Sequence, residues 1–285
     1  MTRKKLRDFL AQADQPIDFR TKVSGKGKKA SSSSHPHFST DRSNKWPEVS
    51  GWSVWEEFSP DTIEMIMGSL LDAEFDFPEA LPYGPDALLI APNEPVFQFD
   101  IVRHNNVIVN VAIAVISEHY PNLVTRCWAS GNSAQCNSDI GIPDFATIPL
   151  KLHSATEEAP NCVCPGDTKF YGKLVQFPYE PEEVEGDDWA MQCLRQVCHY
   201  AVHRRTRYFY LLTPEGAIIG RRSHSTTSGL APEIVKVFWH ASQEDLNVNT
   251  ALLFQFIVAG LNHDVDHTYK SLQDEYGPMF RRFGP

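Results

Sequence analysis

The clearest helical pattern in the chain follows Ser59. Apolar residues recur every three or four positions at Ile63, Ile66 and Leu70, which is the spacing of one helix face. Ser59 is a favourable N-cap residue, and Pro60 suits the first helical position because no backbone N–H donor is needed there. The pattern therefore predicts a helix that begins at Pro60 and buries its apolar face.

The patterns of three further segments also predict helices. Most of residues 94–119 reads as one core helix, although the β-branched run VIVNVAIAVI within it also permits a strand. Residues 189–205 place Gln196 and Tyr200 four positions apart, and hence on one helix face. Residues 249–263 are almost continuously apolar, which is typical of a core helix.

The middle of the chain changes to short runs in which apolar and polar residues alternate, the pattern of strands. These runs lie at residues 123–129, 144–152 and 162–177, and two more within residues 207–223 are joined by a turn at residues 213–216. Alternating groups of helices and strands predict an α/β or α+β fold, with a central mixed β-sheet flanked by helices.

Residues 1–45 differ from the rest of the chain in composition and charge. They hold 11 Lys or Arg and four Asp, a net charge of +7, so the remainder carries −10 − 7 = −17. Residues 24–44 are also rich in Ser, Gly and Lys, a composition that cannot offset its ordering entropy. We therefore expect a disordered basic tail over residues 1–45 and a single folded domain over residues 46–285. Such a tail is either solvated or helps to hold nucleic acid.

The sequence leads us to expect an intracellular protein, cytoplasmic or nuclear. No apolar run reaches the roughly 18 residues of a membrane span, and the N-terminus lacks the apolar stretch of a secretory signal. We therefore expect no membrane partner, and we expect the six cysteines to be reduced thiols. The sequence makes no prediction of the oligomeric state.

Charged residues interrupt two of the predicted strands. Asp144 follows a proline in IPDFATI, and Asp167 and Lys169 lie on either side of Thr168 in VCPGDTKF. Alternate residues of a strand share a face, so the Asp167 and Lys169 side chains project together. If the strands pair, two carboxylates and the Thr168 carbonyl converge as ligands for a hard divalent cation such as Mg²⁺ or Mn²⁺. The simpler interpretation is a surface ion pair of little energetic value.

The order of these motifs resembles that of the PD-(D/E)XK nuclease superfamily, and in particular its mostly uncharacterised fungal members. The resemblance covers about residues 90–260 and implies a restriction-endonuclease-like core. It implies that Asp144 and Asp167 bind the metal and that Lys169 is catalytic. It also implies that Gln196 and Tyr200 form the helix-borne pair that supports the site and its substrate.

A glutamate on the first core helix often completes the site in that superfamily. Glu94, in NEPVFQFDIV, fits this place best, and Glu118, in ISEHY, is the second choice.

The function expected from this resemblance is metal-dependent hydrolysis of phosphodiesters in DNA or RNA. Two alternatives remain open. The first is a tRNA-dependent synthase on a repurposed nuclease-like fold, such as a fungal arginine-containing cyclodipeptide synthase, which would need no metal. The second is a non-catalytic nucleic-acid-binding protein. The acidic body argues against a cleft for duplex DNA, because duplex-binding surfaces are usually basic.

Overall fold

The fold is taken from a computed structural model of the chain. The structure describes residues 1–11, 46–79, 94–134, 141–150, 162–169, 189–222, 230–239, 246–265 and 269–281.

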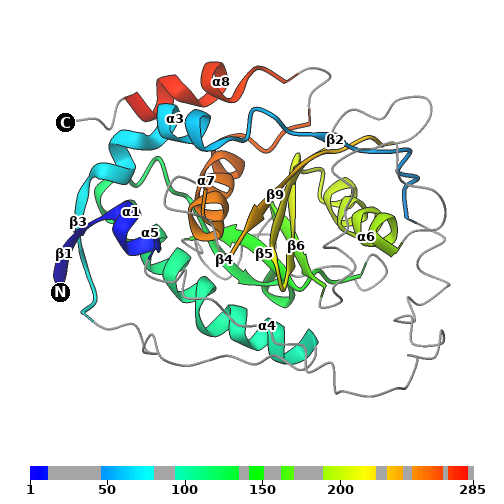
Figure 1. The fold of residues 1–285 in the computed structure, drawn as a ribbon, viewed down its shortest axis with the longest axis horizontal. Helices are drawn as coiled ribbons and strands as arrows, with labels where there is room; N and C mark the ends of the chain where they lie inside the picture. The colour runs from blue at the N-terminus through cyan, green and yellow to red at the C-terminus, as the bar shows by residue number, and fades with distance from the viewer. Residues whose placement is uncertain are drawn as a thin grey trace, which may run out of the picture.

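A mixed sheet forms the centre of the described fold (Figure 1). Its strands, in spatial order, are β2 (Ser53–Val54), β9 (Glu233–Phe238), β8 (Gly216–Arg221), β7 (Tyr208–Thr213), β6 (Pro165–Thr168), β5 (Phe145–Pro149) and β4 (Arg126–Ser130). The β2–β9 and β6–β7 pairs are parallel, and the other neighbouring pairs are antiparallel. The predicted mixed sheet is therefore confirmed, with β2 and β9 as strands that the sequence pattern did not reveal.

Helices cover both faces of this sheet (Figure 1). On one face lies α6 (Trp189–His203), which buries Leu194 and Val197 against Phe209 and Leu211 of β7. On the other face lie α5 (Asn105–His119) and α7 (Val248–Leu261). Successive apolar side chains of β7 alternate between these two cores, so the strand is buried on both faces.

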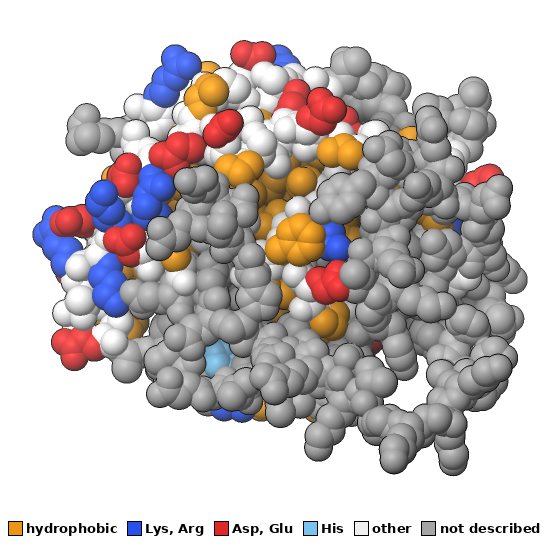
Figure 2. Space-filling view, in the orientation of Figure 1, with side chains coloured by type: hydrophobic (Ala, Val, Ile, Leu, Met, Phe, Trp, Pro, Cys, Tyr) orange, Lys and Arg blue, Asp and Glu red, His pale blue; other side chains and the backbone are white. Residues whose placement is uncertain are grey.

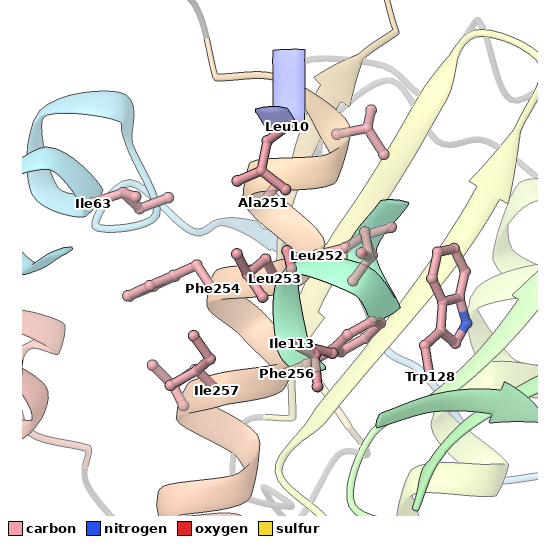
Figure 3. Packing of buried hydrophobic residues seen from close by; sticks show 14 of the residues in the cluster. Leu10, Ile63, Ile113, Trp128, Ala251, Leu252, Leu253, Phe254, Phe256 and Ile257 are labelled. Carbon is pink, nitrogen blue, oxygen red and sulfur yellow. The ribbon is translucent and has the colours of Figure 1, made fainter. Parts of the chain in front are cut away.

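Helix α7 is the centre of the larger core. Figure 3 shows its Phe254, Phe256 and Ile257 packed among side chains of the other elements, including Trp128 of β4. One of its buried amides, Gln255, donates hydrogen bonds to two carbonyl oxygens of the sheet, at 2.9 and 3.1 Å. The donor nitrogen Nε2 of this buried side chain is therefore hydrogen-bonded.

The helix predicted from Ser59 is confirmed as α3 (Pro60–Asp72). The Ser59 hydroxyl accepts a hydrogen bond from the Thr62 backbone N–H at 3.2 Å, as expected of an N-cap. A helix that was not predicted, α8 (Leu272–Phe280), packs against α3.

The helix predicted over residues 94–119 is divided in two. Helix α4 (Glu94–Arg103) is followed directly by α5, and His104 between them is the N-cap residue of α5. By length and composition alone the whole stretch is long and apolar enough to cross a membrane, where the sequence analysis expected no such segment. This is weak evidence for a span, because α5 buries Ile108, Ile113 and Ile116 in the core of the fold.

The expected tail over residues 1–45 is wrong for its first eleven residues. They form β1 (Thr2–Lys5), which pairs with β3 (Glu74–Phe77), and α1 (Leu6–Ala11). The Phe9 ring stacks on Phe77 with centroids 3.9 Å apart, so apolar burial outweighs the basic composition. Basic side chains of this N-terminal segment form ion pairs with acidic side chains of β3 and α3. Figure 2 shows basic and acidic side chains interspersed at the left of the view. The rest of the expected tail lies outside the described residues.

Candidate active site

Strand pairing brings Asp144 and Asp167 together. β5 and β6 are antiparallel with Phe145 opposite Gly166, which places Asp144 next to Asp167 across the strands. Gly166 is needed at this point because a Cβ there would lie 2.0 Å from the Tyr210 ring of β7. The predicted pairing of the two charged segments is thus confirmed.

Lys169 lies on the Asp167 side of β6, as predicted from strand alternation. Its ammonium donates a hydrogen bond to Oδ2 of Asp167 and forms an ion pair with it. Only 2% of Asp167 and 7% of Lys169 are exposed to solvent. The pair is therefore buried and differs from the weak surface ion pair considered as the simpler interpretation.

Thr168 points the other way and holds Asp144. Its backbone N–H donates to Oδ2 of Asp144 at 2.8 Å, and its hydroxyl donates to the same oxygen. The Thr168 hydroxyl also accepts a hydrogen bond of 2.6 Å from the side-chain amide of Gln98 on α4. The two residues that follow Asp167, Thr168 and Lys169, thus each contact one of the two acids.

Gln98 is a site residue that the sequence analysis missed. It lies one turn after Glu94 on the same helix face, so the spacing from Glu94 was the available signal. Glu94 itself is half-buried in the first turn of α4. Glu118 is exposed near the end of α5, where His119 packs against Phe75 of β3, and it does not belong to this site.

Two glycines fix the chain that leads to Asp144. The Gly131 backbone N–H donates to the Asp144 carbonyl at 2.9 Å, and a Cβ on Gly131 would lie 1.6 Å from the Pro143 carbonyl oxygen. Gly141 has a φ of +89°, and a Cβ there would lie 3.4 Å from the Tyr200 ring. Tyr200 of α6 therefore packs directly against the loop that carries Asp144.

Helix α6 supplies the predicted polar pair. The Gln196 amide donates to the Tyr200 hydroxyl oxygen at 2.9 Å. Burial and the negative charge of Asp167 both raise the pKa of Tyr200, so its hydroxyl remains protonated. Because the oxygen already accepts from Gln196, the hydroxyl proton is left to donate toward a neighbouring group.

The two acids share one electrostatic environment. Burial raises the pKa of Asp167 well above its usual range, and the charge of Asp144 adds to that effect. For Lys169, burial alone would lower the pKa, but the charge of Asp167 outweighs it and raises the pKa. Two carboxylates and one ammonium leave an excess of negative charge, so this cluster favours uptake of a proton or a cation.

The cation ligands expected from the sequence are the two aspartates and the Thr168 carbonyl, all of them oxygen donors. Within the described segments no group of three or more His, Cys, Asp or Glu side chains is arranged to hold a metal. Mg²⁺ is commonly bound by only one or two carboxylates while it keeps several waters. The cysteines beside β5 and β6, Cys162 and Cys164, are buried.

Comparison with protein-family models, with curated proteins and with solved structures finds no match for this chain.

Proposed function

We propose that the chain is a metal-dependent nucleic-acid phosphodiesterase with a PD-(D/E)XK-like, restriction-endonuclease-like core. The observation that supports this most is the joint placement of Asp144, Asp167 and Lys169 at the end of β6. Tyr200 stands beside them from α6, since the charges of Asp167, Lys169 and Asp144 all act on its hydroxyl. Two acids, one ammonium and one neutral hydroxyl are the groups that phosphodiester hydrolysis needs.

Asp144, Asp167 and the Thr168 carbonyl would hold Mg²⁺ or Mn²⁺. When bound, such an ion supplies positive charge beside a phosphoryl oxygen and lowers the pKa of a coordinated water. The fit rests on the two adjacent carboxylates and on the raised pKa of Asp167. Burial and, to a smaller extent, the charge of Asp144 raise this pKa, and a bound cation would favour the ionised carboxylate against both effects.

The protein's own groups have distinct roles in this proposal. Lys169 remains an ammonium because Asp167 stabilises its charge, so it would stabilise charge on the phosphoryl oxygens rather than act as a base. Tyr200 would donate its proton to a phosphate oxygen, oriented by Gln196. A water oxygen attacks phosphorus and loses a proton to solvent, the bridging P–O bond breaks, and the departing alkoxide takes a proton from a second water.

The test is cleavage of labelled single-stranded DNA, duplex DNA and RNA by the purified full chain with Mg²⁺ or Mn²⁺. We expect cleavage that EDTA abolishes and that Asp167→Ala and Lys169→Ala reduce at least about a hundredfold. The matched control is Thr147→Val, because Thr147 is buried on the neighbouring β5 and its hydroxyl makes no hydrogen bond to any described residue. A chain inert toward every substrate with both ions would overturn the proposal.

One observation favours a tRNA-dependent synthase as the second candidate. Lys169 already neutralises Asp167, so the site presents polar groups for an aminoacyl ester without any metal. Incubation with arginyl-tRNA and a second charged tRNA, followed by mass spectrometry, should then yield a cyclic dipeptide in the presence of EDTA. Absence of any such product removes this candidate.

A further inference from the structure

A chain of hydrogen bonds links α4 to Asp144 through Thr168. The amide nitrogen Nε2 of Gln98 lies 2.6 Å from the Thr168 hydroxyl oxygen, and that hydroxyl also contacts Oδ2 of Asp144. The direction of each bond is fixed by chemistry. An ionised carboxylate only accepts and the amide NH₂ only donates, so the single Thr168 proton goes to Asp144.

This arrangement occupies one oxygen of each acid. Thr168 gives both its backbone N–H and its hydroxyl to Oδ2 of Asp144, and Lys169 gives its ammonium to Oδ2 of Asp167. Each carboxylate oxygen can accept more than one bond, so both aspartates keep acceptor capacity for a cation.

We propose that Thr168 and Gln98 are positioning residues of the cation site, and that they act by orienting Asp144. Gln98 acts through Thr168, because it holds the hydroxyl in the rotamer that points its proton at Oδ2. The inference rests on the proposed function, since it assumes that Asp144 and Asp167 bind a divalent cation. Groups that orient metal ligands in this way typically change metal affinity by about 10- to 100-fold when removed.

The side chains allow a clean separation of these roles. Thr168→Val keeps the shape and the backbone N–H but removes the hydroxyl, whereas Thr168→Ser keeps the hydroxyl. Gln98→Met keeps the length of the side chain but removes the amide donor. If Gln98 acts only through the hydroxyl, Gln98→Met has no effect once Thr168 is valine, and the double variant equals Thr168→Val alone.

The experiment is calorimetric titration of the full chain with Mn²⁺ alone. Wild type, the four variants and the control Thr147→Val are compared. Thermal melts first establish that each protein is folded at the titration temperature. We expect Thr168→Val to weaken binding about tenfold, Thr168→Ser and Thr147→Val to stay within about twofold of wild type, and Gln98→Met to weaken it about threefold. In the Thr168→Val background, Gln98→Met should leave the affinity unchanged.

Three outcomes overturn the inference, and they differ in what else they affect. Binding of Mn²⁺ by Thr168→Val and Gln98→Met as tightly as by wild type removes the positioning role but leaves the proposed function intact. An equal loss from Gln98→Met in both backgrounds shows that Gln98 does not act through Thr168. A wild type that binds no Mn²⁺ overturns the proposed function, and the inference with it.

Discussion

The ammonium of Lys169 donates to Oδ2 of Asp167, two residues earlier on the same side of β6, and both side chains are buried. An isolated buried charge is costly, so each partner depends on the other for its ionised form. Asp144 lies beside this pair with its carboxylate held by Thr168. The end of β6 therefore brings two acidic side chains and one ammonium together, and four predictions follow from this placement and the fold around it.

The first prediction concerns the stability of the protein as pH changes. The folded-state pKa of Asp167 is raised, so its contribution to stability is fully present below the unfolded-state pKa and is lost as pH rises through the folded-state value. Asp167→Asn cannot lose a proton, so without divalent cations the variant should gain melting temperature relative to wild type as pH rises. Thermal melts of both proteins in EDTA from about pH 4 to about pH 8 check this. A difference that stays constant over that range would contradict it.

The second prediction concerns Gly131. A Cβ at this position would lie 1.6 Å from the Pro143 carbonyl oxygen, which is backbone and cannot rotate away. Gly131→Ala should therefore displace the segment that carries Asp144, lower the free energy of unfolding by about 1 to 3 kcal/mol and weaken Mn²⁺ binding. Gly51→Ala is the matched control, because a Cβ on Gly51 meets nothing within 4 Å. Equal melting temperatures for the two variants would sink this account of the loop.

The third prediction separates a tail from a folded N-terminus. Phe9 is buried and stacked on Phe77, so Phe9→Ala should lower the free energy of unfolding by about 3 to 5 kcal/mol. Met65→Ala, at a side chain 65% exposed on α3, should change it by less than about 0.5 kcal/mol. Chemical denaturation of the two variants checks this. A Phe9→Ala protein as stable as Met65→Ala would mean that the N-terminus does not belong to the core.

Local signals explain which parts of the structure the sequence predicted. Helix α3 has its cap and its apolar period within one segment, and Asp167 and Lys169 share a strand face through alternation alone. The placement of Asp144 beside them was predictable because both charged segments have a strand pattern and lie close in the sequence. The prediction of these features does not depend on contacts with distant residues.

The missed features depend on contacts between distant segments. Strand β1 is the polar run TRKK, and only its pairing with β3 and the burial of Phe9 show that it is folded. Gln98 is an ordinary polar residue on a helix until α4 docks beside Thr168, 70 positions away in the sequence. The spacing from Glu94 places Gln98 on the same helix face, but the contact itself depends on how α4 docks.

The fourth prediction is the most direct test, because it asks whether Asp144 and Asp167 form one cation site. Electron paramagnetic resonance of free Mn²⁺ should show about one ion bound by wild type and by Thr147→Val. Asp144→Asn and Asp167→Asn keep the shapes of the side chains, and Asp144→Asn also keeps the Lys169–Asp167 ion pair. Variants shown to be folded by thermal melts should leave the free Mn²⁺ signal nearly unchanged. Wild type that binds no Mn²⁺, or aspartate variants that bind as much as wild type, would contradict the account.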